Sequence, residues 1–570
     1  MCSTTSEPKA GEGGHRIASL DRKTGSRGEG DLAGRDRLVG NVLGSWAAQL
    51  VFIVAGFLLP RVIDRHVGQE ALGVWDFSWS LVSYFGLVQV GIVASVNCYV
   101  ARNRAAGNLA GLNSAVSSVT CLLIAMAATV LMLATGAVFV MPILFRDSAP
   151  EMITDAKWVV FLNGAGLAVQ IAFSAFNSVL TGCFRYGIAN AICAGTYAAT
   201  AACMIAALVL GGGLRSLALV HLGGEALLWG MVYLAAHRVC PGLRVRLSSA
   251  RWSVARDMAA FGGKMFMFTV SDLLQGQAAG ILIAVFLGPA VLALYSRAMA
   301  LIRNTSAMVG RLATVLTPMA SSLETMGEQQ ELRGLLVKAT RYVTYSVVPV
   351  VLTLCLLGGA VLRVWMGANY EQDAVLAILA IGHFAAMFQR PAFNIMVGLN
   401  LHGRLGLVNL AAAILSAALM AAALGWLRAG LEGVALALVV PLTLANGIYT
   451  PMCTCRRVGL PFGRYVFQSL KGPILCAVPF GACLLAARIT FADRAGVALA
   501  VGVGTGGLVL APLYWRYALP PRLKEKLRKV LSCVYRACDS RKTLTSAPES
   551  GKDSARVAPQ PKGETPADCL

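Results

Sequence analysis

The chain has 570 residues, of which 57% are hydrophobic and only 14% are charged, and its formal net charge is +21. Soluble proteins carry about 25% charged residues, so this composition excludes an ordinary soluble domain and predicts a polytopic membrane protein. A positive charge can indicate nucleic acid, but in membrane proteins Lys and Arg collect in cytoplasmic loops, so no nucleic-acid partner is expected. The 15 cysteines show neither a disulfide framework nor zinc spacing, so neither metal nor cofactor is expected.

The apolar segments predict an all-α chain of transmembrane helices. Residues 1–38 are polar and mixed in charge, and they are expected to contain no cleavable signal peptide and to form a disordered cytoplasmic tail. A spanning helix needs ~20 mostly apolar residues, and about fourteen segments meet this criterion. They begin near Val42, Trp79, Ser117, Trp158, Ile188, Leu217, Gly262, Ala290, Tyr342, Ala374, Leu405, Leu431, Ile474 and Ala495.

The connections between these segments alternate in charge. Those after the second, sixth, twelfth and fourteenth segments are basic, as in "HRVCPGLRVRLSSARWSVARD" after the sixth. The connection after the third, "FRDSAPEMITD", is net acidic, and "GANYEQD" after the ninth has no Lys or Arg. Because the basic connections of membrane proteins lie in the cytoplasm, both termini are expected there, with residues 521–570 as a basic tail. The expected location is the inner (plasma) membrane.

An internal repeat relates the two halves of the apolar chain. "VGQEALGVWDF" at 67–77 resembles "LGPAVLALYSR" at 287–297, an offset of 220 residues, and "RYGIAN" at 185–190 resembles "RLGLVN" at 404–409, an offset of 219. The repeat predicts a lobe of six helices at 39–240, a second at 241–460, and two added helices at 461–520. Six is an even number, so both lobes have the same topology, which is a transporter pattern with the substrate path at the repeat interface.

Three arginines lie in the segment "SRAMALIRNTSAMVGRLATVL" at 296–316. At 3.6 residues per turn, Arg297, Asn304 and Arg311 fall within about 40° of one another and form a polar stripe, with Arg303 to one side. A guanidinium inside a bilayer is costly, so the stripe is expected to face protein or water. Snorkelling to the headgroups is the alternative for Arg297 and Arg311, but it fits Arg303 poorly.

Other polar residues also fall inside predicted spans. Lys264 and Asp272 share a face of the seventh, and either a structural ion pair or a titrating acid accounts for Asp272. His383 and Arg390 lie in the tenth, where Pro391 is expected to kink the helix.

Cations outnumber acids among these buried residues, which predicts a cationic cavity for an anionic substrate. The predicted substrate-binding residues are Lys264, Arg297, Arg303, Asn304, Arg311 and Arg390. The residues predicted to couple an ion are Asp272, Glu225 and His383, although Glu225 and His221, four residues apart, also have the spacing for a simple hydrogen bond. With no Walker motif and no catalytic constellation, the chain is expected not to be an enzyme.

Three stretches resemble a known family. Residues 40–96, from "GNVLGSWAAQ" to "GIVASV", resemble the opening of bacterial polysaccharide flippases of the multidrug/oligosaccharidyl-lipid/polysaccharide (MOP) exporter superfamily, as do "FLGPAVLALYSRAMALIRNTS" and "VWMGANYEQDAVLAILAIGHF" from the second half. The resemblance implies a MATE-like fold of two six-helix lobes plus two helices, and alternating access powered by H⁺ or Na⁺. It implies as substrate an anionic oligosaccharide on an undecaprenyl diphosphate carrier, with membrane lipids and the polysaccharide polymerase or chain-length machinery as partners.

Several alternatives stay open. A lipid II flippase shares the span count and the anionic cargo, whereas a multidrug extruder usually has twelve spans and an acidic cavity. A membrane polysaccharide polymerase needs a large external loop, and a scaffold that only recruits partners has no need of buried charges. The glycan, the coupling ion and the oligomeric state are not predicted from the sequence.

Overall fold

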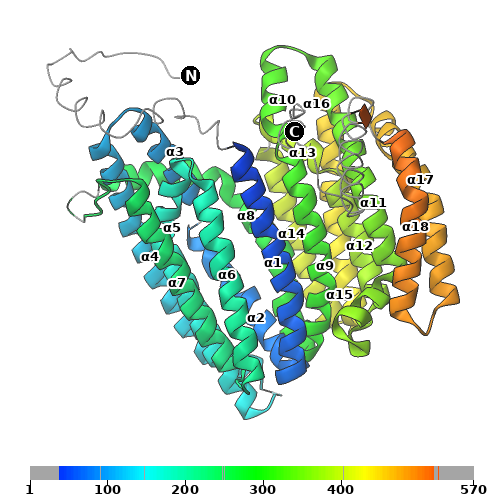
Figure 1. Ribbon diagram of the computed structural model, residues 1–570, viewed down its shortest axis with the longest axis horizontal. Coiled ribbons are helices and arrows are strands. Elements are labelled where there is room, and N and C mark those ends of the chain that lie inside the picture. Colours follow the sequence, from blue (N-terminus) through cyan, green and yellow to red (C-terminus); the bar gives the residue numbers. More distant parts are fainter. Residues whose placement is uncertain are drawn as a thin grey trace, which may run out of the picture. The chain divides into compact units, whose positions relative to one another are not determined.

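The structure is a computed structural model of the chain, and it describes residues 38–89, 92–146, 148–246, 248, 251–401, 403–518 and 524–525. Within these residues all regular secondary structure is helical, as predicted (Figure 1). The predicted tails at 1–38 and 521–570 lie outside the described residues, apart from Leu38, Lys524 and Glu525. Two compact units result: residues up to Ser296 with Gly406–Leu438 form unit 1, and Arg297–Leu405 with the residues from Val439 onward form unit 2. The predicted lobe boundaries stay a prediction.

Unit 1 contains α1 (Leu38–Val67), α2 (Gln69–Phe85), η3 (Gly86–Gln89), α3 (Ile92–Ala105), α4 (Leu109–Leu144), α5 (Pro150–Gly182), α6 (Tyr186–Val209), α7 (Leu214–Val239), α8 (Trp252–Leu287), the first residues of α9 (Pro289–Ala313), most of α14 (Gly403–Gly425) and most of α15 (Gly430–Leu442). Unit 2 contains the rest of α9, α10 (Leu316–Thr325), α11 (Gln329–Met366), η5 (Ala368–Tyr370), α12 (Asp373–Phe388), α13 (Arg390–Gly398), the π-helical turn η6 (Thr443–Tyr449), α16 (Thr450–Val458), α17 (Phe462–Thr490) and α18 (Ala495–Tyr517).

The number of membrane-spanning helices agrees closely with the prediction. Among the described residues, 12 helical segments are long and apolar enough to cross a membrane. The fourteen predicted starts fall in fourteen different helices, and α1 and α9 are the two that are not among the 12. The three arginines within α9 lower its hydropathy, although they do not prevent one continuous helix. The chain is therefore a multi-pass membrane protein.

The backbone supports the internal repeat. Gly68 at the start of α2 has φ 95° and ψ 167°, and Gly288 at the start of α9, 220 residues later, has φ 87° and ψ 164°. Only glycine adopts this backbone conformation without strain, which explains why both copies of the motif place glycine there. Phe184 before α6 and Asn400 before α14 both have φ 56° and follow two corresponding helix ends.

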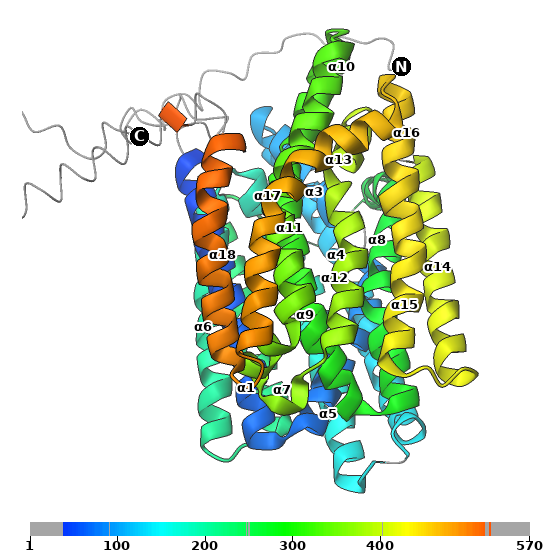
Figure 2. The same ribbon diagram turned by 90° about the vertical axis from the view of Figure 1, so that its right-hand side faces the viewer.

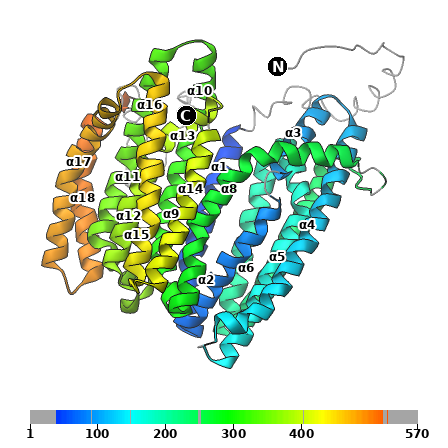
Figure 3. The ribbon, with the colours of Figure 1, turned by 180° about the vertical axis from the view of Figure 1, so that it is seen from behind.

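Unit 1 packs around α5. Its long neighbours α4 and α7 run alongside it, and α3 joins the same cluster (Figure 1 and Figure 3). The contact surfaces are aliphatic: Val116 and Leu123 from α4 and Ile171 and Val179 from α5 are fully buried. These helices form the wall that positions the polar residues described below.

Two thiols lie at one end of this bundle, outside the spans. Cys183 follows α5, Cys240 follows α7, and both are buried. A hydrogen bond from the Cys240 thiol, supported by the charge of Arg104, lowers the pKa of Cys183 and raises that of Cys240. We expect Cys240→Ala to raise the pKa of Cys183, because the hydrogen bond to the thiolate is lost while burial remains. The pH dependence of Cys183 alkylation, followed by peptide mass spectrometry, measures this, and an unchanged midpoint would contradict it.

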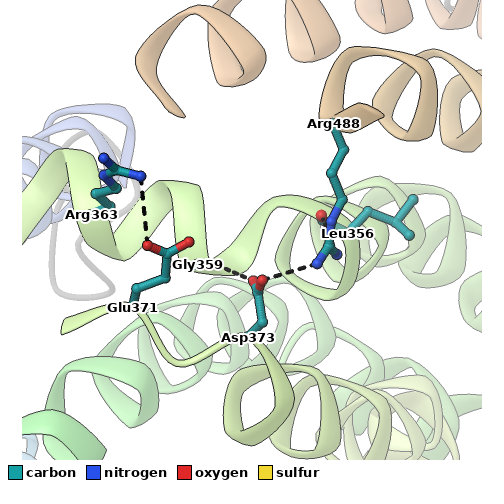
Figure 4. Close-up of polar contacts among 6 residues, drawn as sticks. All are labelled: Leu356, Gly359, Arg363, Glu371, Asp373 and Arg488. Atoms are coloured by element: carbon teal, nitrogen blue, oxygen red, sulfur yellow. Dashed lines mark hydrogen bonds and ion pairs between the residues drawn. The ribbon is translucent and has the colours of Figure 1, made fainter. Parts of the chain in front are cut away.

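In unit 2, helix α11 is broken near its C-terminal end, and side chains of neighbouring helices form hydrogen bonds with the backbone beside the break. Leu357 has non-helical φ −125° and ψ 20°. Arg488 from α17 donates to the Leu356 carbonyl (2.9 Å) and to Asp373 (3.0 Å), and Asp373 accepts from the Gly359 N–H (2.7 Å) (Figure 4). Side chains from α12 and α17 thereby satisfy backbone groups on either side of the break. The α17–α18 pair, side by side in Figure 2, is thus fastened to α11 by polar as well as apolar contacts.

Removing the Arg488 guanidinium tests this role. We expect Arg488→Ala to lower the free energy of unfolding by about 1 kcal/mol, since the pair is 45% and 40% exposed and solvent screens it. Arg363→Ala is the matched control, because its contact with Glu371 is a longer 3.8 Å and spans no helix break (Figure 4). Thermal unfolding of the purified variants measures both, and equal losses would contradict the special role of Arg488.

Two further irregularities face each other in unit 2. The predicted kink before Pro391 is present, since α12 ends at Phe388 and α13 begins at Arg390. Gln389, at the break, donates to Asn446 within the π-helical turn η6 (3.2 Å), and both side chains are buried. Breaks of this kind concentrate at moving or functional parts of membrane helices.

Candidate functional site

Two adjoining cavities lie inside unit 1, with volumes of ≈ 410 and ≈ 450 Å³. Trp79, Gln170, His221 and Glu225 line both cavities, and we refer to the two together as the unit 1 site. The other lining residues include Ser83, Gln89, Asn163 and Thr269 in the first cavity and Phe52, Trp75, Tyr197 and Trp229 in the second. Helices α2, α5 and α7 each contribute a polar or aromatic residue to both.

Glu225 is the acidic residue of the site. It lies on α7 with His221 one turn before it and Trp229 one turn after it, the i, i+4 spacing that places three side chains on one helix face. The Trp229 indole N–H donates to Glu225 Oε2 (2.9 Å), and His221 Nε2 lies 3.8 Å from Glu225 Oε1. The predicted hydrogen bond between His221 and Glu225 is therefore a longer contact of 3.8 Å, and Trp229 is the closer partner.

An aromatic cluster surrounds His221. The centroid of its ring lies 5.1 Å from that of Trp79 and 6.1 Å from that of Trp75, with both tryptophans nearly perpendicular to it. Trp75 is 6% exposed and fixed by packing, whereas Trp79 is 42% exposed. The cluster holds His221 in one orientation and leaves the Trp79 indole available to a ligand.

Two buried polar atoms of the site have no hydrogen-bond partner among the described residues: Asn163 Oδ1 and His221 Nδ1. Asn163 is 2% exposed, and its Nδ2 donates to Ser78 Oγ (3.0 Å), which in turn donates to the Val159 carbonyl (3.4 Å). This chain fixes the amide, so Oδ1 is the atom left to accept. A buried polar atom that stays without a partner costs about 1–3 kcal/mol, so both atoms are available to hydrogen-bond to water or to a ligand in the cavity.

The predicted ion-coupling residues have different surroundings. Glu225 belongs to the unit 1 site. Asp272 is exposed on α8 of the same unit and is not among the residues that line the site. His383 is partly buried on α12 of unit 2, where its Nδ1 contacts the Leu379 carbonyl (2.9 Å). Glu225 is thus the predicted coupling residue that lines the unit 1 site, and the coupling role of all three stays a prediction.

The predicted cationic residues are also distributed. The side chain of Lys264, on α8 of unit 1, lies outside the described residues. Arg297, Arg303, Asn304 and Arg311 lie on the single helix α9 as predicted, and Arg297 is only 5% exposed whereas Arg303 and Arg311 are exposed. Arg390 is partly buried at the start of α13. Whether these residues share one cavity stays a prediction.

Three residues of the unit 1 site were not predicted from the sequence: Trp79, Asn163 and Gln170. A signal was available: Asn163 and Gln170 are seven residues apart in the apolar helix α5, the same spacing that identified the stripe on α9. Trp79 carried no comparable signal, because tryptophan is common at membrane interfaces whatever its function.

Comparison with known proteins agrees with this architecture. Residues 114–375 match a family described as polysaccharide biosynthesis protein. The uncharacterized membrane protein EpsK of Bacillus subtilis (strain 168) is 27% identical over 176 residues, which cover 30% of this chain and 34% of EpsK. The match thus spans about a third of that relative's length.

Solved transporters share the fold. A multidrug resistance MATE family transporter of the MOP superfamily, in an inward-facing conformation, aligns with a TM-score of 0.61 and 13% identity over 71% of this chain and 94% of its own. A MOP superfamily transporter from Pyrococcus furiosus, described as having a binding pocket of reverse polarity, aligns with a TM-score of 0.52 and 15% identity over 74% and 95%. The chain is therefore a multi-pass membrane protein with the fold of MOP superfamily transporters, and its predicted resemblance to polysaccharide biosynthesis proteins is confirmed over residues 114–375.

Proposed function

We propose that this transporter flips an oligosaccharide linked to undecaprenyl diphosphate from the cytoplasmic to the outer leaflet of the inner membrane. The observation that carries the proposal is the combination of a polysaccharide biosynthesis match with a transporter fold that holds a polar cavity between its helices. A polar head group cannot cross a hydrocarbon layer unaided, and a cavity lined by amides, tryptophan and a carboxylate replaces its water. The chain supplies a path and alternating access, and no bond of the substrate breaks.

The arginines of α9 suit the diphosphate. Arg303 and Arg311 are exposed on the helix that also bears the buried Arg297, and a guanidinium pairs with phosphate through two parallel hydrogen bonds. Arginine remains charged at any physiological pH, so its attraction for the diphosphate does not depend on a proton. The diphosphate is thereby held by α9 while the glycan occupies other parts of the path.

Glu225 suits the coupling ion. It combines an acidic side chain with a mostly buried location, and its contacts with Trp229 and His221 change when a proton or Na⁺ is taken up. The inner membrane location, cytoplasmic termini, and contact with the polymerase and chain-length machinery complete the proposal.

The deciding experiment uses a strain that lacks this gene. Its lipids are extracted and the undecaprenyl-diphosphate-linked species are analysed by mass spectrometry, together with the surface polysaccharide. We expect lipid-linked oligosaccharide to accumulate and the surface polymer to be lost, and the accumulated species identifies the glycan. An unchanged lipid pool with intact polymer would overturn the proposal, and accumulation of the peptidoglycan precursor would identify a lipid II flippase instead.

Substitutions in α9 test the role of the cations. We expect Arg303→Ala and Arg311→Ala to lose at least about tenfold of export while inserting normally, because each removes a charge-assisted contact of about 1.5–3 kcal/mol. Surface polysaccharide and protein level are measured in the complemented deletion strain. Arg428→Ala, at an exposed position after α14, is the matched control and should export normally. Normal export by both α9 variants would assign these arginines a structural role.

A multidrug extruder is the second candidate, and one observation favours it: the unit 1 site combines Glu225 with tryptophans, a lining that attracts cationic aromatic compounds. Increased drug sensitivity of the deletion strain, with an unchanged lipid pool, would select this reading.

A further inference from the structure

We propose that the unit 1 site binds one uncharged pyranose ring of the transported oligosaccharide, a hexosyl or N-acetylhexosaminyl unit, stacked on Trp79 and hydrogen-bonded by Asn163, His221 and Glu225. The inference rests on the proposed function, and it assigns the unit 1 site to one part of the proposed substrate, a sugar ring. Transport of a lipid-linked glycan does not by itself place a sugar here, so the two are tested separately.

The aromatic surface is the first argument. Trp79 lines both cavities and is 42% exposed, while the rings of Trp75 and His221 pack against it edge to face. A pyranose ring has one face of C–H bonds that packs against an electron-rich indole, and its edge of hydroxyl groups stays free for hydrogen bonds. A phosphate has no such apolar face and gains nothing from the indole.

The hydrogen-bonding groups are the second argument. Asn163 Oδ1 is a buried acceptor without a partner among the described residues, and Glu225 Oε1 has only the 3.8 Å contact with His221. These atoms need a ligand that brings donors, and sugar hydroxyl and acetamido groups bring several. His221 Nδ1, also without a partner there, donates or accepts according to its tautomer, which matches a hydroxyl group in either role.

Charge and size exclude the other parts of the substrate. Among the described residues that line the site, Glu225 is acidic and none is Lys or Arg, so a diphosphate or a uronic acid meets repulsion without a counter-charge. The cavities of ≈ 410 and ≈ 450 Å³ fall within the ~300–1,000 Å³ usual for small-molecule sites and exceed what a bare cation fills. Among the described residues no group of three or more His, Cys, Asp or Glu side chains is placed to hold a metal ion.

The test uses the purified full chain in lipid nanodiscs and saturation-transfer NMR. The probes are the methyl glycosides of glucose, galactose and mannose, their 2-acetamido counterparts, and methyl glucuronide. We expect transfer to the ring C–H protons of at least one uncharged glycoside, and at least about threefold less to the glucuronide. Trp79→Ala should abolish the transfer and Trp79→Phe should retain part of it, because phenylalanine keeps an aromatic face.

Trp158→Ala is the matched control. Trp158 is a 48% exposed tryptophan on α5 of the same unit that lines neither cavity, so its removal should leave the transfer unchanged. Asn163→Leu is a second variant that keeps roughly the volume of the side chain and removes the Oδ1 acceptor, and it should weaken the transfer while the yield of folded protein is retained.

Each outcome separates the inference from the proposed function. No transfer from any glycoside, equal transfer to the glucuronide, or transfer that survives Trp79→Ala would overturn the inference. Displacement of a bound glycoside by glucuronide, or a site that responds to Na⁺ but to no glycoside, would also overturn it. If the deletion strain nevertheless accumulates lipid-linked oligosaccharide, the flippase function stands and the sugar is recognised elsewhere.

Discussion

Glu225→Gln should reduce export by about ten- to a hundredfold, because the amide keeps the size of the side chain but not its charge. Charge-assisted hydrogen bonds contribute about 1.5–3 kcal/mol, and each 1.4 kcal/mol corresponds to a factor of ten. Trp229 can still donate to the amide oxygen, so the helix face around it is retained. Surface polysaccharide and lipid-linked intermediates in the complemented deletion strain measure the loss.

Two further variants make this result interpretable. Glu225→Asp keeps the charge on a shorter side chain and should retain part of the export. Glu432→Gln removes an exposed acid at the start of α15 in the same unit and should export normally. Export by Glu225→Gln at the level of Glu432→Gln would remove Glu225 from both coupling and substrate binding.

The helices were predictable because a bilayer imposes a strong requirement on sequence. Each spanning helix needs ~20 apolar residues, and the fourteen predicted starts fall in fourteen different helices. The starts themselves were less accurate. Helix α2 begins at Gln69, well before the predicted Trp79. The predicted start was late because Gln69 and Glu70 lower the hydropathy of this segment. In the folded protein their side chains bond to Ala290 and Ser148. Such tertiary partners leave no local signal.

The helix breaks were only partly predictable. Proline marks the break before Pro391, because its ring removes a donor from the helix. The break at Leu357 has no such residue, and Arg488 and Asp373, which satisfy the adjacent backbone groups, come from other helices. A residue far along the chain that supplies the missing hydrogen bond is visible only in the folded structure.

Part of the candidate site, the pair Glu225 and His221, could be predicted from helical periodicity. Glu225 and His221 share a face of α7 because they are four residues apart, and this face is buried in the site. Periodicity places residues on one side of one helix but does not say which neighbour that side meets. Asn163 and Trp79 reach Glu225 from other helices, and Arg297 and Arg303 on a single helix differ widely in exposure for the same reason.

Gly73→Ala should be among the most destabilising single-methyl changes in unit 1. A Cβ added at Gly73 of α2 would lie 1.8 Å from the carbonyl oxygen of Pro289, at the start of α9. Gln69 bonds to the Ala290 carbonyl (2.9 Å) one turn earlier, so the two helices are held together at this crossing. The obstacle is backbone, which no rotamer change relieves, so the helices must separate. Overpacking of this kind costs about 1–3 kcal/mol, and more where the backbone has to move.

The measurement is the melting temperature of the purified variant, together with the yield of monodisperse protein. Gly136→Ala is the matched control, since a Cβ at Gly136 in α4 meets nothing within 4 Å. Alanine is intrinsically better than glycine in a helix by about 1 kcal/mol, so the control should be as stable as the wild type or slightly more so. The two substitutions add the same methyl group to the same fold. A difference between their melting temperatures therefore reports the close contact of α2 with the start of α9. Equal melting temperatures for the two variants would show that α2 and α9 are not in close contact at Gly73.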